Sequence, residues 1–322
     1  MSTLIVFCRC CDTPISLRCF CSQHCQPAMS RILLASDGLR ARDNGEWAKN
    51  KLSFLDVALR SVLAATKTKR DRIYVDLFAG PGMNRVGESG PEFEGSPLRV
   101  LRAVGLDHSQ TVFTRAIFVN ANREDHRALQ VRVDRALTQG RTAVRDGRIE
   151  VRHGDANRLL PEIMASIHPL AYVFVFADIE GPKQWPWSSV TGLKAGGHKS
   201  VDLYTLFLLD MAITRLIACN HQPLNQYAPI LTSYFGTDAW TRIGKGRVTN
   251  AQSPELRREL VELYRRQLRT QWTYADEVLD VFLRGHQRLY KMMFASAHPA
   301  AKAISAWAAK EMREAENLGL GL

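Results

Sequence analysis

The stretch Ile73-Tyr-Val-Asp-Leu-Phe-Ala-Gly-Pro-Gly82 decides the fold of this chain. Its first residues are mostly apolar or aromatic, which is typical of a strand covered on both faces in a parallel α/β sheet. Asp76 lies near the carboxyl end of that strand, where open α/β sheets bind ligands. Gly80 and Gly82 allow the next loop to adopt unusual backbone angles and to lie close to a ligand. The stretch therefore predicts a buried strand that ends at a ligand-binding loop.

Strands and helices alternate along most of the rest of the chain. We expect further strands at 115–122, 148–157, 171–179, 200–209 and 289–297, and helices at 47–63, 96–104, 123–137, 158–167 and from 299 onward. Residues 87–95 are expected to form a loop, and the segment from 213 to about 269 reads as mostly helical without a strand. This order predicts an α/β fold with a Rossmann-like, doubly wound, mainly parallel sheet and a helical cap at about 213–275.

Composition and charge restrict the class of protein. The chain has 322 residues, of which 46% are hydrophobic and 23% charged, as in ordinary globular proteins. No apolar run approaches the ~20 residues needed to cross a bilayer, and the amino terminus lacks the features of a signal peptide. We therefore expect a cytoplasmic protein that does not enter a membrane. The formal charge of +11 favours a polyanionic partner such as nucleic acid, although a dispersed basic surface explains it equally well.

Cysteine is concentrated in a leader at residues 1–28. Six of the seven cysteines lie there: Cys8, Cys10, Cys11, Cys19, Cys21 and Cys25. Their spacings lack the two paired CxxC knuckles that are typical of zinc sites, so no metal site is predicted. Disulfides are not expected in a cytoplasmic chain. A metal site with His24 as a further ligand is conceivable, and the other alternative is an extension upstream of a natural start at Met29. The folded domain is expected to comprise residues 29–322.

The glycine loop fits one class of ligand better than others. It is not a P-loop, because no Gly-Lys-Ser/Thr follows, and a dinucleotide site lacks its third glycine at the required spacing. A carboxylate beside a glycine loop suits a ligand with an ammonium group and hydroxyls, such as S-adenosylmethionine (SAM). The alternative is a Gly-Pro-Gly turn without a ligand. The cofactor-binding residues predicted here are Asp76, Phe78, Ala79, Gly80, Pro81 and Gly82.

Polar residues at the ends of the next two strands extend this prediction. Asn120 stands where nucleoside-binding α/β folds place an acid that contacts the ribose, but an amide lacks the charge of a carboxylate. After the third strand, Asp155 in Gly154-Asp-Ala-Asn157 is a candidate acceptor for the adenine amine, with Ala156 beside it. A turn role for Asn120 and a helix N-cap role for Asp155 are the alternatives.

The end of the central strand supplies the candidate catalytic groups. Asp178 closes this strand and Glu180 follows two residues later, at the sheet edge where catalytic and substrate groups collect. Either carboxylate is a candidate to act as a base or to hold the substrate. Trp185 and Trp187 in the following loop are candidates for stacking against a flat substrate, or for packing that loop against the helical cap.

Several blocks together resemble the three-Cys-motif partner protein (TcmP) family, whose members look like class I SAM-dependent methyltransferases. The resemblance rests on Trp47 with the Lys49/Lys51 helix, on "YVDLFAGPG" (74–82), "EGSPLRVL" (94–101) and "GDAN" (154–157), and on the Asp178 strand end, "YFGTDAW" (234–240) and "YKMMFASAHP" (290–299). It implies SAM as cofactor and a separate three-Cys-motif protein as partner. The chain departs from the family pattern at Asn120, where the family is acidic, and at Asp178-Ile-Glu-Gly181, which replaces a "DPFG"-like block.

The loop is also similar to the "DLFAGxG" opening of cytosine-C5 DNA methyltransferases. That chemistry needs a Pro-Cys nucleophile, and the chain contains no Pro-Cys dipeptide. The (Asp/Asn)-Pro-Pro-aromatic block of amino-methylating enzymes is missing as well. The expected function is SAM-dependent methyl transfer to an unidentified substrate, with nucleic acid as the leading class. The rival is a non-catalytic or regulatory subunit that keeps the fold for binding.

Overall fold

In the computed structural model, helices and strands alternate along most of the chain. The described residues are 33–45, 47–102, 112–140, 142, 144–219, 227–244, 253–282 and 288–317. The cysteine-rich leader at 1–28 lies outside them.

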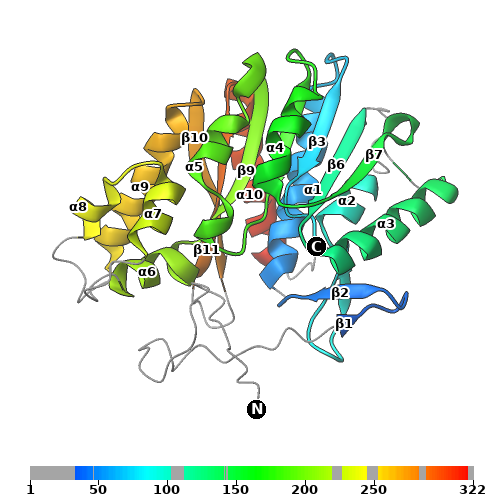
Figure 1. Ribbon diagram of the computed structural model, residues 1–322, viewed down its shortest axis with the longest axis horizontal. Coiled ribbons are helices and arrows are strands. Elements are labelled where there is room, and N and C mark those ends of the chain that lie inside the picture. Colours follow the sequence, from blue (N-terminus) through cyan, green and yellow to red (C-terminus); the bar gives the residue numbers. More distant parts are fainter. Residues whose placement is uncertain are drawn as a thin grey trace.

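A seven-stranded sheet forms the centre of the molecule (Figure 1). Its order is β10-β11-β9-β8-β3-β6-β7, and its strands are β3 (Arg72–Asp76), β6 (Arg115–Asn120), β7 (Ile149–His153), β8 (Tyr172–Ala177), β9 (Ser200–Phe207), β10 (Tyr274–Phe282) and β11 (Arg288–Ser296). The first five are parallel, and β11 is inserted antiparallel between β9 and β10. Renumbered in chain order within this sheet, the strands therefore run 3-2-1-4-5-7-6. The predicted Rossmann-like, mainly parallel sheet is confirmed.

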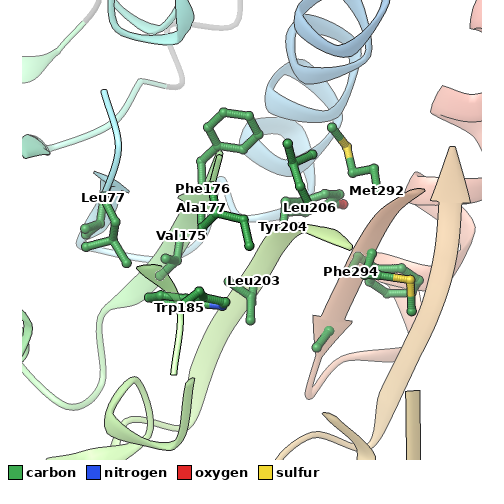
Figure 2. Close-up of a cluster of buried hydrophobic side chains, with 14 of the residues drawn as sticks. Leu77, Val175, Phe176, Ala177, Trp185, Leu203, Tyr204, Leu206, Met292 and Phe294 are labelled. Carbon is green, nitrogen blue, oxygen red and sulfur yellow. The ribbon is translucent and has the colours of Figure 1, made fainter. Parts of the chain in front are cut away.

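The central strands are buried because helices cover both faces of the sheet. Every residue of β3 and β8 is buried, which explains their continuous apolar sequences. Aromatic rings run across neighbouring strands: Tyr74 stacks on Phe174 with ring centroids 5.7 Å apart, and Phe174 stacks on Tyr204 at 4.9 Å. Figure 2 shows apolar side chains of β8, β9 and β11 gathered in this core. The sheet thus gives a rigid frame for the loops at its edge.

Ten α-helices surround the sheet in the described residues. They are α1 (Trp47–Ala65), α2 (Ser96–Arg102), α3 (Arg123–Thr138), α4 (Ala156–Ala165), α5 (Trp187–Gly192), α6 (Thr214–Cys219), α7 (Ala228–Phe235), α8 (Trp240–Gly244), α9 (Pro254–Arg269) and α10 (Pro299–Asn317). Helix α1 packs against α10 behind the sheet, and α4 packs against α5 in front of it (Figure 1). None of the described helices is long and apolar enough to cross a membrane.

Helices α6–α9 lie between β9 and β10, where the sequence predicts a helical insertion. They form a lobe at one end of the sheet, and α9 packs against β10 (Figure 1). Ser253 caps α9 because its hydroxyl accepts a hydrogen bond from the Leu256 N–H at 3.1 Å. The strand β10 that follows was not predicted. Its sequence mixes Asp and Glu with apolar residues, since it is an edge strand with only one neighbour.

A second, small sheet was also not predicted. It joins β1 (Leu33–Leu34), β2 (Arg40–Asp43), β4 (Met83–Arg85) and β5 (Glu92–Glu94) in the order β1-β2-β4-β5. The prediction of a continuous loop at 87–95 is therefore wrong, because β5 pairs with β4. Strands of two to four residues carry too little periodicity to be recognised, and β2 pairs with a strand some 40 residues away. In Figure 1 this sheet lies below the carboxyl ends of β3 and β6.

Candidate functional site

One pocket brings the glycine loop together with the end of β8. It has about 290 Å³ of empty space, part of it open to solvent. Five predicted residues line it: Ala79, Gly80, Pro81, Gly82 and Asp178. The remaining lining residues are Arg42, Asn44, Lys51, Leu52, Asn84, Gly95 and Ser96. The pocket is therefore closed by the small sheet and α1 as well as by the loops of the large sheet.

The glycine loop has the backbone conformation expected from its sequence. Gly80 and Gly82 have φ angles of 65° and 88°, a region that favours glycine. A Cβ atom on Gly82 would lie 3.0 Å from Leu129 Cδ1, which is closer than ordinary van der Waals contact. The Gly82 carbonyl accepts a hydrogen bond from the Gly95 N–H at 2.8 Å. The loop is thus pressed between α3 and the start of α2.

Asp76 is fully buried and does not itself line the pocket, but it shares a hydrogen bond with Ser96, which does. One of its carboxylate oxygens accepts from the Phe78 N–H at 3.2 Å, and the other lies 3.4 Å from the Tyr74 hydroxyl. Burial raises the pKa of Asp76 to about 7, and the nearby charge of Asp178 adds to this effect, whereas hydrogen bonds such as that from Ser96 oppose it. A buried acid with a perturbed pKa in a pocket is typical of a functional group.

The two candidate catalytic acids each face a cation. Lys51 Nζ lies 2.5 Å from Asp178 Oδ2, and both side chains are largely buried. Arg42 forms an ion pair with Glu180, whose side chain is 64% exposed at the mouth of the site. Within the described part of the chain, no group of three or more His, Cys, Asp or Glu side chains could hold a metal ion. In the structure the positive charges that face these two acids belong to Lys51 and Arg42.

Sequence reasoning missed the residues that come from the amino-terminal segment. Arg42 comes from β2 and Lys51 from α1, and Asn44 donates a hydrogen bond to Asn84 at 2.7 Å across the pocket wall. The pocket position of Lys51 could have been recognised in the sequence, because this lysine lies on the buried face of α1, one helical turn before Leu55. The position of Arg42 could not, since it depends on the pairing of β2 with the distant β4.

The remaining predicted cofactor residues lie at the same sheet edge but outside the pocket lining. Asn120 is buried, and its side-chain amide donates to the Gly80 carbonyl at 2.9 Å, so it supports the glycine loop. Asp155 caps α4, because its carboxylate accepts from the Arg158 N–H at 3.0 Å. Ala156 is the first residue of that helix and is buried. The N-cap alternative for Asp155 is thus present in the structure.

The tryptophan loop packs against the helical lobe. Trp185 is fully buried, and its ring meets Phe78 edge-on with centroids 6.0 Å apart. Trp187 lies over Gly236 at the end of α7 and makes an edge contact with Tyr264 at 6.1 Å. Stacking of a substrate on Trp185 is excluded, because this side chain is fully buried. Packing of the loop against the cap, the alternative reading of the sequence, is what these contacts show.

Comparisons with known proteins give only distant similarities. No protein-family model and no curated protein matches the chain. The solved structures that are similar include LPL1258 from Legionella pneumophila, of the family DUF519 (10% identity, TM-score 0.47, 81% of this chain and 90% of that chain). A conserved hypothetical protein from Streptococcus pyogenes gives 15% identity and a TM-score of 0.28 over 47% of this chain and 78% of that chain.

A third similar structure is the O-methyltransferase of a trans-AT PKS multienzyme from Brevibacillus brevis, in complex with S-adenosyl-L-homocysteine. It shares 10% identity with a TM-score of 0.26, over 82% of this chain and 83% of that chain. Because all three TM-scores are below 0.5, these similarities carry no argument about function. The case for a function rests on the sheet topology and the pocket.

Proposed function

We propose that this protein is a class I SAM-dependent methyltransferase that binds its cofactor over the Gly80–Gly82 loop. The observation that carries the proposal is the place of the buried Asp76, directly below a glycine loop at the carboxyl end of β3. Strand order reverses between β3 and β8, and ligands of open α/β sheets bind at such a switch point. The order 3-2-1-4-5-7-6 with an antiparallel seventh strand is also that of class I methyltransferase folds.

The residues around the pocket fit the parts of SAM. Asp76 and Asp178 supply negative charge for the methionine ammonium group. Asn120 and Asp155 lie on the neighbouring strand ends, on the side where the ribose and adenine would extend. When bound, SAM supplies an electrophilic methyl group on a sulfonium. The protein contributes by orienting the acceptor toward that methyl group.

Nucleic acid is the substrate class that we propose, in cooperation with a three-Cys-motif partner protein. The net charge of +11 supports a polyanionic substrate, because cationic side chains that neutralise phosphates release bound counterions. The proposal of a three-Cys-motif partner rests only on the resemblance of the sequence blocks to the TcmP family.

A non-catalytic partner or regulatory subunit is the second candidate, and one observation favours it. Asp178 and Glu180 are both paired with cations in the structure. Each carboxylate would have to leave its cationic partner before it could contact an acceptor group of a substrate. In this reading the pocket binds SAM without transferring its methyl group.

A labelled-methyl transfer assay separates the two candidates. The protein is incubated with SAM carrying a labelled methyl group and with pools of DNA, RNA and protein, each with and without a three-Cys-motif protein. The proposal predicts label in a nucleic-acid pool, with less transfer at higher salt and none for Asp76→Ala. SAM binding without transfer to any pool would support the subunit, and failure to bind SAM would refute both.

A further inference from the structure

We infer that Arg42 and Lys51 form a binding site for the carboxylate of the amino-acid part of SAM. The inference rests on the proposed function and deepens it, since it assigns a ligand group to two residues of the amino-terminal segment. Neither residue belongs to the seven-stranded sheet or to the glycine loop.

Both cations stand beside the loop that the cofactor would cross. They line the same pocket as Gly80 and Asp178. A Cβ atom on Gly80 would lie 3.6 Å from Arg42 Nη1, so the guanidinium lies against the open side of the loop backbone. Lys51 is only 3% exposed and points its ammonium group at Asp178. A ligand lying over Gly80 would thus meet two cations within one small pocket.

Stability alone does not account for these two cations. Replacing a buried ion pair such as Lys51–Asp178 by apolar residues is often neutral or stabilising, because both charges lose their hydration. The Arg42–Glu180 pair contributes little to folding, because Glu180 is mostly exposed to solvent. Because both cations line the same pocket, an anionic group of a ligand is a second possible partner for them.

The charges of the pocket are complementary to a zwitterion. Asp178 lines the pocket together with the cations Arg42 and Lys51, and the ammonium of Lys51 pairs with Asp178. The second acid, Asp76, is buried behind the lining residue Ser96. The amino-acid part of SAM carries one ammonium and one carboxylate. A guanidinium presents parallel N–H donors that match the two oxygens of a carboxylate.

A buried arginine of α3 fixes the hairpin that carries Arg42. Arg132 donates to both carboxylate oxygens of Asp37 at 2.8 Å, and its Nη1 donates to the carbonyls of Arg40 at 2.8 Å and Pro81 at 2.5 Å. One side chain therefore connects the β1–β2 hairpin to the glycine loop. This connection holds Arg42 in position over the loop before a ligand arrives, which lowers the ordering cost of binding.

The test compares SAM with decarboxylated SAM, which lacks only the carboxylate. Calorimetric dissociation constants are measured for wild type, Arg42→Gln, Arg42→Lys and Lys51→Met, and thermal denaturation verifies that each variant folds. Arg85→Gln is the matched control, because Arg85 belongs to the same small sheet on β4 but lies outside the pocket lining.

Arg42→Gln and Lys51→Met should each weaken SAM binding by about ten- to hundredfold, as expected for a lost charge-assisted hydrogen bond. Binding of decarboxylated SAM should stay within about threefold of wild type, since it makes no such bond. The SAM affinity of Arg42→Lys should lie between those of wild type and Arg42→Gln, and the SAM affinity of Arg85→Gln should equal that of wild type. Equal losses for both ligands, or no loss for either, would overturn the carboxylate assignment while leaving SAM binding intact. A wild-type protein that binds neither ligand would overturn the proposed function as well.

Discussion

Asp76→Asn should stabilise the fold at neutral and alkaline pH while it removes a cofactor-binding charge. Burial raises the pKa of Asp76 from 3.8 to about 7. Between these two values the folded state keeps a proton that the unfolded state has lost, so the free energy of unfolding of wild type decreases as pH rises. Below pH 3.8 the penalty is absent, and above about pH 7 it is fully present. Asparagine removes the ionisation and keeps an oxygen that accepts from the Phe78 N–H.

The magnitude follows from the size of the pKa shift. Each pH unit of differential titration is worth about 1.36 kcal/mol. The penalty therefore increases by about 2 kcal/mol between pH 5 and pH 7 and by about 3 kcal/mol between pH 5 and pH 8. The free energy of unfolding of Asp76→Asn minus that of wild type should therefore rise by about 3 kcal/mol between pH 5 and pH 8. Titration of all other groups cancels in this difference, apart from groups coupled to Asp76 such as Asp178.

Urea denaturation followed by far-UV circular dichroism at the two pH values measures this difference. The slope of each transition shows whether the variant unfolds by the same two-state process as wild type. A difference that does not change with pH would refute the reasoning, because it would mean that Asp76 has the same pKa in the folded and unfolded states. A decrease in the difference would mean that the folded state favours the ionised carboxylate.

Two further predictions concern the segments that shape the pocket. Gly82→Ala should lower the free energy of unfolding by about 3 kcal/mol, because Gly82 has a positive φ and a Cβ atom there would press on Leu129. Gly87→Ala should lower it by only about 1 kcal/mol, because Gly87 has a positive φ but open space around it. Equal losses of unfolding free energy in chemical denaturation would contradict the close packing of the glycine loop. Arg132→Lys should lower the free energy of unfolding by about 2 kcal/mol or more, because lysine cannot bond both oxygens of Asp37 and two carbonyls. A loss below about 0.5 kcal/mol would show that this arginine does not hold the hairpin.

The large sheet could be predicted because its strands are covered on both faces. The apolar runs at β3 and β8 identify buried parallel strands, and the chain order of strands and helices then leaves few alternatives. The strand ends were less well defined: β3 ends at Asp76, whereas the apolar residues of the 73–82 stretch continue to Ala79. Leu77 and Ala79 continue the apolar pattern, and their N–H groups still donate to the Phe176 and Val119 carbonyls at 3.1 and 3.0 Å.

The side of the pocket that the amino-terminal segment forms could not be predicted, because it depends on contacts between distant segments. Arg42 and Glu180 are separated by 138 residues, and Lys51 and Asp178 by 127. No local sequence pattern predicts ion pairs between residues this far apart in the chain. The position of Lys51 on the buried face of α1 is the one local sign, since a lysine among Leu and Phe side chains needs a partner.

Asn120 shows why residue type alone does not define a role at this edge. Its place at the end of β6 suggested a ribose contact, and its amide instead donates to the Gly80 carbonyl. The side-chain oxygen is the atom left to interact with a hydroxyl. The structure thus connects Asn120 to the glycine loop, and the ribose contact stays a prediction.

Titration of the protein with SAM by calorimetry tests the central claim most directly. The pocket over Gly80–Gly82 predicts saturable binding with one site per chain, which Asp76→Ala abolishes or weakens at least tenfold, as for a lost interaction with a charged group. Arg85→Gln, outside the pocket, should bind as wild type does. Absence of binding to the folded wild-type protein, or equal affinity of the Asp76→Ala variant, would contradict a SAM site at this loop.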